Sequence, residues 1–318
     1  MTAILNVFLL VIGFVFLLKG ADFLVDGAVG IAKRFNISTL VIGMTIVAFG
    51  TSAPEAAVSI TASLEENNAI SYSNVIGSNI FNLLMVGGIC AIVRPLKIQK
   101  IAVTRDYPFH ILITVALLVL CLDTVLGDGQ TMLLSCGDGI ILLLFMCIFM
   151  YMNIKDGMSN PQETEESAEK PSFVKNIILF IIGLAGVILG GNFVVDSGTV
   201  IAKLLGVSDT LIGLTIVAIG TSLPELVTSV VAGKKGETDI AWGNIVGSNV
   251  FNILFVLGIS STLSSFTVDI QSIYDTVIAL VVSTLVYFAT AKSKRIGKPL
   301  GAVMVLTYII YTAYIIIR

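Results

Sequence analysis

Two copies of one short polar motif interrupt apolar stretches of this 318-residue chain. They are Gly50-Thr-Ser-Ala-Pro-Glu55 and Gly220-Thr-Ser-Leu-Pro-Glu225. In each copy the glutamate follows the threonine by four residues and the serine by three, so a helix would place these side chains on one face. Carboxylate and hydroxyl oxygens grouped in this way are typical ligands of hard cations.

Each motif contains a proline that we expect to break its helix. Pro54 and Pro224 lack the amide hydrogen and would clash with the preceding turn. Backbone carbonyls just before a break lose their helical partners, and at membrane depth they must face protein, water or an ion. The carbonyls concerned are those near Ala48, Thr51, Ala218 and Thr221.

A second polar stripe follows each motif. Its three residues recur every four positions along an otherwise apolar stretch, so they share one helix face. They are Asn74, Ser78 and Asn82 in the first copy and Asn244, Ser248 and Asn252 in the second. Gly77 and Gly247 lie within these stripes, where a small residue predicts close packing against the broken helix.

Together the motifs and stripes offer only oxygen ligands. Calcium takes about 6–8 oxygens, carbonyl and amide oxygens among them, whereas zinc and copper(I) favour cysteine or histidine. The one histidine, His110, is expected near a helix end, and the four cysteines lack metal-ligand spacing and are expected to pack. Two carboxylates balance one calcium ion or two sodium ions, so one site could bind either in turn.

The composition indicates a membrane protein. Hydrophobic residues make up 56% of the chain and charged residues 12%, with a mean hydropathy of +1.00, whereas soluble domains are about a quarter charged. A membrane-spanning helix needs roughly 17–25 mostly apolar residues. Ten stretches qualify: 4–32, 38–64, 70–93, 107–122, 137–153, 173–202, 208–233, 239–263, 272–290 and 298–317. The predicted fold is an all-α membrane protein of ten transmembrane helices, with helices 2 and 7 broken at the midplane.

The chain also contains an internal repeat with an offset of 170 residues. Residues 20–26, 43–55 and 74–82 align without a gap to residues 190–196, 213–225 and 244–252. The chain thus divides into a first five-helix repeat (1–153), an acidic linker (154–172) and a second five-helix repeat (173–318). Because five is odd, the second repeat enters the membrane inverted, and inverted repeats are typical of transporters whose site lies at the repeat interface.

The charges of the loops predict the orientation in the membrane. If the spans alternate, fifteen loop lysines and arginines fall on one side and only Lys203 and Arg318 on the other. Positive loops face the cytoplasm, so we expect a plasma-membrane protein with both termini extracellular and the linker cytoplasmic. Asp26 and Asp196 also recur, but they lie near span ends, where capping or interfacial roles are expected.

Glu55 and Glu225 lie well inside their predicted spans. An ionisable side chain at the centre of a membrane helix costs on the order of 3 kcal/mol, so two at matching positions indicate a function. A hydrolase would need a nucleophile and a general acid that nothing outside the polar stripes supplies. We therefore expect a transporter rather than an enzyme or a channel, with no cofactor, no nucleic-acid partner and no required protein partner.

These paired motifs resemble those of the calcium/cation antiporter superfamily, and most closely its sodium/calcium exchanger branch, over nearly the whole chain. The resemblance implies exchange of sodium for calcium by alternating access, in which the first and sixth spans slide against the other eight, as Gly20, Gly190 and Gly191 would permit. It also implies ion ligands in both repeats. They are the Ala48 carbonyl, Thr51, Ser52, Glu55, Ser78 and Asn82, and the Ala218 carbonyl, Thr221, Ser222, Glu225, Ser248 and Asn252.

Three departures from related branches refine this expectation. Proton/calcium exchangers typically carry a histidine after the key glutamate, where this chain has Ala56 and Leu226. Potassium-dependent exchangers carry aspartate where this chain has Asn252, and the calcium-sensing domains of animal exchangers are absent from residues 154–172. We therefore expect sodium/calcium exchange that needs no potassium. A proton-coupled calcium antiporter is the alternative, because two nearby glutamates could carry protons.

Overall fold

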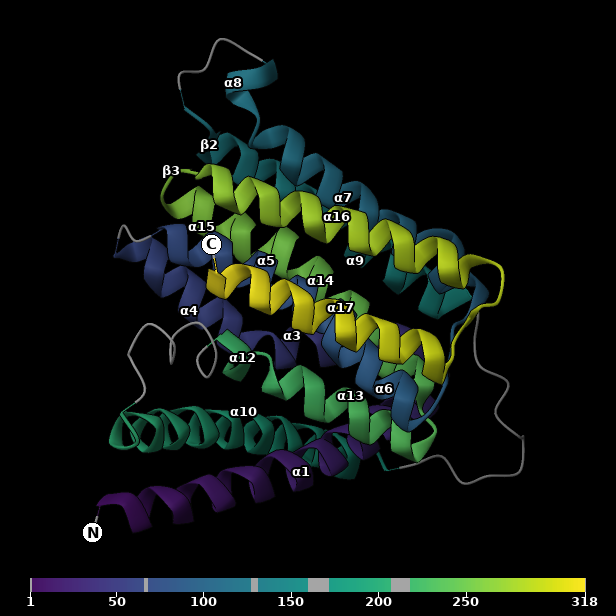
Figure 1. Ribbon diagram of the computed structural model, residues 1–318. Helices are drawn as coiled ribbons and strands as arrows, with labels where there is room; N and C mark the ends of the chain where they lie inside the picture. The colour runs from purple at the N-terminus through teal and green to yellow at the C-terminus, as the bar shows by residue number, and fades with distance from the viewer. Residues whose placement is uncertain (1, 66–67, 127–130, 160–171, 207–217, 318) are drawn as a thin grey trace.

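The computed structural model describes residues 2–65, 68–126, 131–159, 172–206 and 218–317 (Figure 1). Within these ranges, eight helices are long and apolar enough to cross a membrane, and a ninth crossing consists of two helices bent by 48° at a break. The predicted span 208–233 begins outside the described residues. Its described part contains α12 (Ala218–Gly220) and α13 (Leu223–Lys235). The helical membrane fold is confirmed.

The remaining elements follow the predicted spans, with η marking a π-helix. The first repeat contains α1 (Thr2–Phe35), α2 (Thr39–Ile42), η1 (Gly43–Val47), α3 (Ala48–Thr51), α4 (Ala53–Leu64), α5 (Asn68–Ile80), η2 (Phe81–Val86), α6 (Gly87–Val93), η3 (Ala102–Asp106), α7 (Tyr107–Leu120), α8 (Asp123–Leu126) and α9 (Cys136–Ser159). The second contains α10 (Phe173–Leu204), α14 (Thr238–Phe251), η5 (Asn252–Leu257), α15 (Gly258–Leu263), α16 (Ile270–Ala291) and α17 (Lys298–Ile317).

Element boundaries repeat with the offset seen in the sequence. The composite helix α5–η2–α6 spans residues 68–93, and its counterpart α14–η5–α15 spans residues 238–263. These two composites form the centre of the molecule, because their most apolar stretches are 78% and 83% buried, against 17% for α1 and for α17. The outer helices present their remaining apolar side chains outward, as lipid-facing helices do.

Two short antiparallel ribbons join the repeats. Strand β1 (Leu96–Lys97) pairs with β4 (Arg295–Ile296), and β2 (Leu133–Leu134) pairs with β3 (Phe266–Thr267). Strands β1 and β3 occupy matching positions in the two repeats. Strands β3 and β4 flank α16 in the chain, so the ribbons lie at opposite ends of that helix (Figure 1). Matching strands at opposite ends are what an inverted repeat requires.

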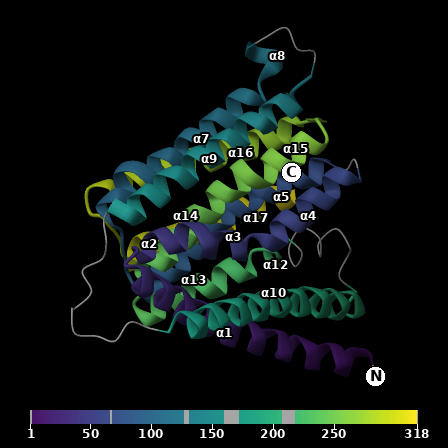
Figure 2. The ribbon, with the colours of Figure 1, turned by 180° about the vertical axis from the view of Figure 1, so that it is seen from behind.

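The long helices α1 and α10 lie side by side at one edge of the molecule (Figures 1 and 2). Glycines let their backbones approach closely: a Cβ on Gly20 would lie 2.6 Å from the Val187 nitrogen, and one on Gly190 would lie 2.6 Å from the Leu17 nitrogen. These glycines therefore join α1 to α10. Of the three glycines expected at the sliding surface, Gly191 alone faces another helix: a Cβ on Gly191 would lie 3.6 Å from the Pro224 ring.

Several helices extend beyond their predicted ends, and two of them do so by five or six residues. The fourth crossing starts at Ala102 rather than 107, because Arg105 and Asp106 form an ion pair of 2.6 Å that lets both charges enter the helix. Helix α9 continues to Ser159, into the predicted linker 154–172, whose residues 160–171 lie outside the described ranges. His110 also differs from expectation. It lies in the first turn of α7, but η3 precedes α7 without a break, so His110 is inside the crossing that starts at Ala102 rather than near its end. Its side chain is buried and stacked on Tyr107 at 5.7 Å between ring centroids.

Candidate ion-binding site

Both motifs break their helices, as the prolines predict. Helix α3 ends at Thr51 and α4 begins at Ala53, with Pro54 in its first turn, where a missing amide hydrogen costs nothing. Between them Ser52 has φ −80° and ψ 6°, outside the helical region. In the second repeat Ser222 has φ −92° and ψ 7°, and Pro224 occupies the first turn of α13. The two serines are the hinge points of the site.

The breaks bring the two copies of the motif together. The Ser52 hydroxyl donates a hydrogen bond of 3.0 Å to Glu225 Oε1, and the Ser222 hydroxyl donates one of 2.8 Å to Glu55 Oε1. All four side chains are buried, and both glutamates have no exposed surface. Each repeat thus supplies a hydroxyl to the glutamate of the other repeat. The residues that the sequence pairs at an offset of 170 form one shared cluster.

The polar stripes complete this cluster. Ser78 Oγ lies 3.1 Å from Ser222 Oγ, and the Ser248 hydroxyl donates to Glu225 Oε1 at 3.5 Å. The Thr51 hydroxyl donates to Asn244 Oδ1 at 3.0 Å. Helices α5 and α14 therefore place their stripes against the two hinges, as their four-residue spacing predicts.

Several buried oxygens of this cluster have no hydrogen-bond partner among the described residues. They are Glu55 Oε2, Glu225 Oε2, Asn82 Oδ1, Asn252 Oδ1 and Thr221 Oγ1. Buried polar atoms in proteins are normally bonded, and an unpartnered one is costly. Among the described residues, neither glutamate forms an ion pair with a lysine or arginine. Carboxylate, amide and hydroxyl oxygens left free in this way suit a hard cation such as calcium or sodium.

The backbone carbonyls at the two hinges are bonded differently. The Ala48 carbonyl, predicted to be freed by the break, accepts the Ser52 N–H at 3.0 Å and lies 3.4 Å from the Thr51 hydroxyl. The reason is that Pro54 removes the hydrogen bond to Gly50, four residues earlier, rather than the one to Ala48. In the second repeat the Ser222 N–H donates to the Ile219 carbonyl at 3.1 Å. The role expected for the Ala218 carbonyl stays a prediction.

The first residue of each stripe forms hydrogen bonds to the helix that follows a hinge. Asn74 Nδ2 donates to Ser59 Oγ at 3.0 Å and to the Glu55 carbonyl at 3.4 Å. Asn244 Nδ2 donates to Ser229 Oγ at 3.0 Å. Ser59 and Ser229 are also 170 residues apart, and this recurrence could have identified them in the sequence. Both amides are occupied by protein groups and do not join the free oxygens.

Asn79 and Asn249 were also missed from the sequence. Asn79 Nδ2 donates to the Asn249 carbonyl, and Asn249 Nδ2 donates to the Asn79 carbonyl, both at 3.2 Å. Asn79 Oδ1 accepts a further bond of 3.0 Å from Asn252 Nδ2. Their recurrence as amides inside apolar spans was the available signal.

The π-helix η5 begins at Asn252 and η2 begins one residue before Asn82. Such segments are frequent at functional sites.

The stripe glycines differ between the repeats. A Cβ on Gly247 would lie 2.7 Å from the Met44 carbonyl and 2.8 Å from the Ala48 Cβ, so the predicted close packing against the broken helix is confirmed there. A Cβ on Gly77 would meet no described atom within 4 Å. The stretch that precedes α12 (207–217) lies outside the described residues, so the packing predicted for Gly77 stays a prediction.

Comparisons with known proteins agree with this geometry. The family described as sodium/calcium exchanger protein matches residues 5–155 and 175–317. The putative antiporter CaxA of Alkalimonas amylolytica is 36% identical over 313 residues, which cover 96% of this chain and 97% of the relative. The sodium/calcium exchanger MaX1 of Methanosarcina acetivorans is 30% identical over 339 residues, which cover 96% of this chain and 97% of the relative.

A solved structure of the sodium–calcium exchanger NCX_Mj has the same fold. It aligns with a TM-score of 0.86 at 34% sequence identity, covering 98% of this chain and 99% of that structure. The resemblance expected from the paired motifs is confirmed over nearly the full length. The chain belongs to the sodium/calcium exchanger family.

Proposed function

We propose that this chain exchanges sodium for calcium across the plasma membrane by alternating access, without a requirement for potassium. One observation carries the proposal: two glutamates without exposed surface share a cluster in which each keeps one unpartnered oxygen. A buried charge is costly unless it is neutralised. Two carboxylates match one calcium ion or two sodium ions, so either cargo would neutralise the same site.

The proposed ligands are those that the sequence implied. The unpartnered oxygens of Glu55, Glu225, Asn82, Asn252 and Thr221 support five of them directly. Thr51, Ser52, Ser78, Ser222 and Ser248 surround the carboxylates, and in this conformation their hydroxyls bond protein groups. The Ala48 and Ala218 carbonyls complete the proposed set. A cation would draw the hydroxyl oxygens of Ser52, Ser222 and Ser248 away from the carboxylates that now accept their hydrogen bonds.

The arrangement of α1 and α10 supports alternation. The two helices pack chiefly on each other. Among the described residues α1 also contacts α2, η1 and α13, and α10 also contacts α3, α12 and α13 (Figures 1 and 2). Two helices that pack chiefly on each other can move as one body. Because the repeats are inverted, such a movement would close one face of the site as it opens the other.

Two alternatives differ in the ion that moves against calcium. An additional carboxylate at position 252 would call for an additional monovalent cation, and this chain has the neutral Asn252 there, so no potassium ion is needed for charge balance. Protons could instead neutralise the two buried glutamates, which share one site and titrate as a pair. Proton-coupled calcium antiport is therefore the second candidate.

Isotope flux separates these functions. Purified protein in liposomes should take up calcium when an opposing sodium gradient is imposed and potassium is replaced by choline on both sides. A proton gradient alone should drive little uptake. Uptake that appears only with millimolar potassium would contradict the charge argument at Asn252, and uptake that follows the proton gradient would favour the alternative.

The proposed orientation has its own test. The loop charges support extracellular termini and a cytoplasmic linker. In a cysteine-free background, a cysteine introduced at Thr2 should react with an impermeant thiol reagent on intact cells, whereas one at Ser167 should be protected. The opposite pattern would invert the assigned orientation.

A further inference from the structure

Reciprocal hydrogen bonds between Asn79 on α5 and Asn249 on α14 connect the two repeats where these helices meet. Each side-chain amide donates to the backbone carbonyl of the other residue at 3.2 Å. Both side chains are buried, with 4% and 1% of their surface exposed. Because the two residues are 170 positions apart, the pair obeys the symmetry of the repeat.

This pair fixes the orientation of a proposed ion ligand. A backbone carbonyl can only accept, so it must receive the NH₂ group of Asn79, and the Asn79 oxygen is left to accept. Asn252 must then donate its own NH₂ group to that oxygen, as it does at 3.0 Å. The Asn252 oxygen is left buried and unpartnered. This chain of hydrogen bonds therefore points the Asn252 oxygen, the proposed cation ligand, away from Asn79.

The matching bond in the other half is not formed. Asn249 is oriented by the Asn79 carbonyl in the same way, and its Oδ1 is a buried acceptor without a partner. Within the part of the chain that the structure describes, Asn82, the counterpart of Asn252, has neither its NH₂ group nor its oxygen bonded. The donor and acceptor of a symmetric Asn82–Asn249 bond are thus both present and both unused in this conformation.

We propose that Asn79 and Asn249 are positioning residues that orient the ligand amides of Asn252 and Asn82 in turn, one in each of the two conformations of the transporter. The proposal rests on the alternating access proposed above. In an inverted repeat, exchanging the roles of the two halves gives the conformation open to the opposite side. The bond made here by Asn252 then passes to Asn82. Each conformation keeps one oriented and one unbonded amide, which keeps their energies similar.

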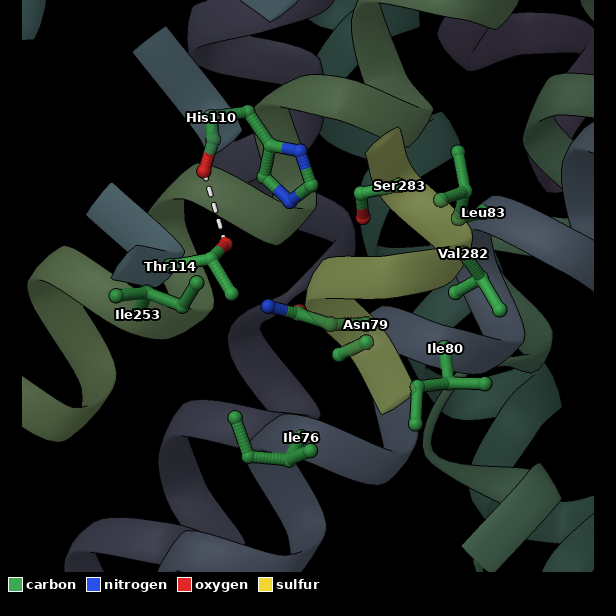
Figure 3. A pocket seen from close by; sticks show the side chains of 10 residues that line it. Ile76, Asn79, Ile80, Leu83, His110, Thr114, Ile253, Val282 and Ser283 are labelled. Carbon is green, nitrogen blue, oxygen red and sulfur yellow. Dashed lines mark hydrogen bonds between the residues drawn. The ribbon is translucent and has the colours of Figure 1, made fainter. Parts of the chain in front are cut away.

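Loss of this orientation should weaken ion binding. A released amide can present its NH₂ group to the ion, and the partial positive charge of that group repels a cation. Residues that orient metal ligands typically change metal affinity by about 10–100-fold. Asn79 lies at a cavity that His110, Thr114 and Ser283 also line (Figure 3). A leucine at this position has a similar volume and offers no acceptor to Asn252.

The test compares Asn79→Leu with the matched control Asn249→Leu. Leucine keeps the volume and removes the amide, and both variants lose one buried amide–carbonyl bond. The Michaelis constant for calcium is measured at each face separately, in vesicles of known orientation. Asn79→Leu should raise it about tenfold at one face and Asn249→Leu about tenfold at the opposite face. Equal changes at both faces, or changes at the same face, would overturn the alternation.

A double-mutant cycle tests the positioning role without transport. Calcium affinity of the purified protein is measured by titration calorimetry for Asn79→Leu, Asn252→Ala and their combination. If Asn79 acts through Asn252, it has no further effect once Asn252 is truncated, and independent effects would refute the role. Should the leucine variant fail to fold, Asn79→Ala is measured in the same cycle. Absence of sodium-driven flux in the wild type would instead refute the proposed function and the alternation with it.

Discussion

The two hinges of this protein have nearly the same sequence and different hydrogen bonds. In the first, Thr51 donates to Asn244, and the Ser52 N–H reaches back four residues to Ala48. In the second, the Thr221 hydroxyl is buried without a partner among the described residues, and the Ser222 N–H donates to the Ile219 carbonyl, three residues earlier. Within the described part of the chain, only the first hinge bonds to the opposite repeat through its threonine.

The difference shows that symmetry of sequence does not impose symmetry on one conformation. Chemically matching groups occupy both halves, so each bond of one half has potential partners in the other. A transporter that alternates needs two arrangements of similar energy, and matching groups provide them. We therefore interpret the unequal hydrogen bonds as those of one conformation. In the opposite conformation the same residues would exchange these bonds between the two repeats.

The glutamates are the exception, because each accepts a serine hydroxyl and each keeps one free oxygen. Glu55→Gln and Glu225→Gln should therefore have equal effects. Each removes half of the negative charge of the site, and charged hydrogen bonds contribute about 1.5–3 kcal/mol, so calcium transport should fall about 10- to 150-fold. Flux assays measure this. Near-normal transport by either variant would contradict the shared site.

The variants should still insert into the membrane, because a neutral midplane side chain lowers the insertion cost. Monodisperse elution in detergent is the control. A loss of flux together with aggregation would reflect folding rather than ion binding.

The stripe glycines offer a sharper contrast between the halves. Gly247→Ala places a methyl group 2.7 Å from the Met44 carbonyl, a backbone atom that cannot move freely. Overpacking of this kind costs about 1–3 kcal/mol. Gly77→Ala meets no described atom within 4 Å, so it should be neutral or slightly stabilising. Thermal unfolding in detergent compares the two. Equal losses would mean that both glycines pack tightly.

The hinge threonines should separate stability from ion binding. Thr51→Val removes a buried hydrogen bond to Asn244 and should cost about 1 kcal/mol in the absence of ions. Thr221→Val removes a hydroxyl without a partner, so stability should be unchanged. Both variants should bind calcium more weakly, because both hydroxyls are proposed ligands. Thermal unfolding in choline buffer and calcium titration measure the two effects, and a destabilised Thr221→Val would count against the asymmetry.

The smallest contrast concerns the ends of the two hinge helices. Lys235 at the end of α13 pairs with Asp26 at 2.7 Å and with Asp22 at 3.4 Å, both on α1. The matching position at the end of α4 is Glu65, of opposite charge. The pairs are partly exposed, so Lys235→Gln should cost less than about 1 kcal/mol, and the loss should disappear in high salt. Glu65→Gln is the matched control and should have no effect. A salt-independent loss would indicate a packing role.

Much of this molecule could be predicted from its sequence, because lipid makes apolar runs and midspan charges easy to interpret. The repeat, the broken helices at Pro54 and Pro224 and the meeting of Glu55 with Glu225 follow from such signals. The expected interfacial role of Asp26 also agrees with its ion pair to Lys235. These features depend on residue type and spacing alone.

What the sequence missed depends on details of backbone geometry. The reciprocal pair of Asn79 and Asn249 required knowing how α5 and α14 cross. The carbonyl expected to be freed near Ala48 also differs, because the missing amide hydrogen of Pro54 frees the carbonyl of Gly50, four residues earlier. The unequal bonding of the two halves has no signal in a symmetric sequence, since it belongs to one conformation rather than to the chain.

The most direct test of the shared site is equilibrium binding of radioactive calcium to the purified protein at increasing sodium concentration. One site that takes either one calcium ion or at least two sodium ions predicts complete displacement with a sigmoidal dependence on sodium. Choline at the same ionic strength should displace none. Calcium that stays bound at saturating sodium would show that the two ions occupy separate sites, and would contradict the account at its centre.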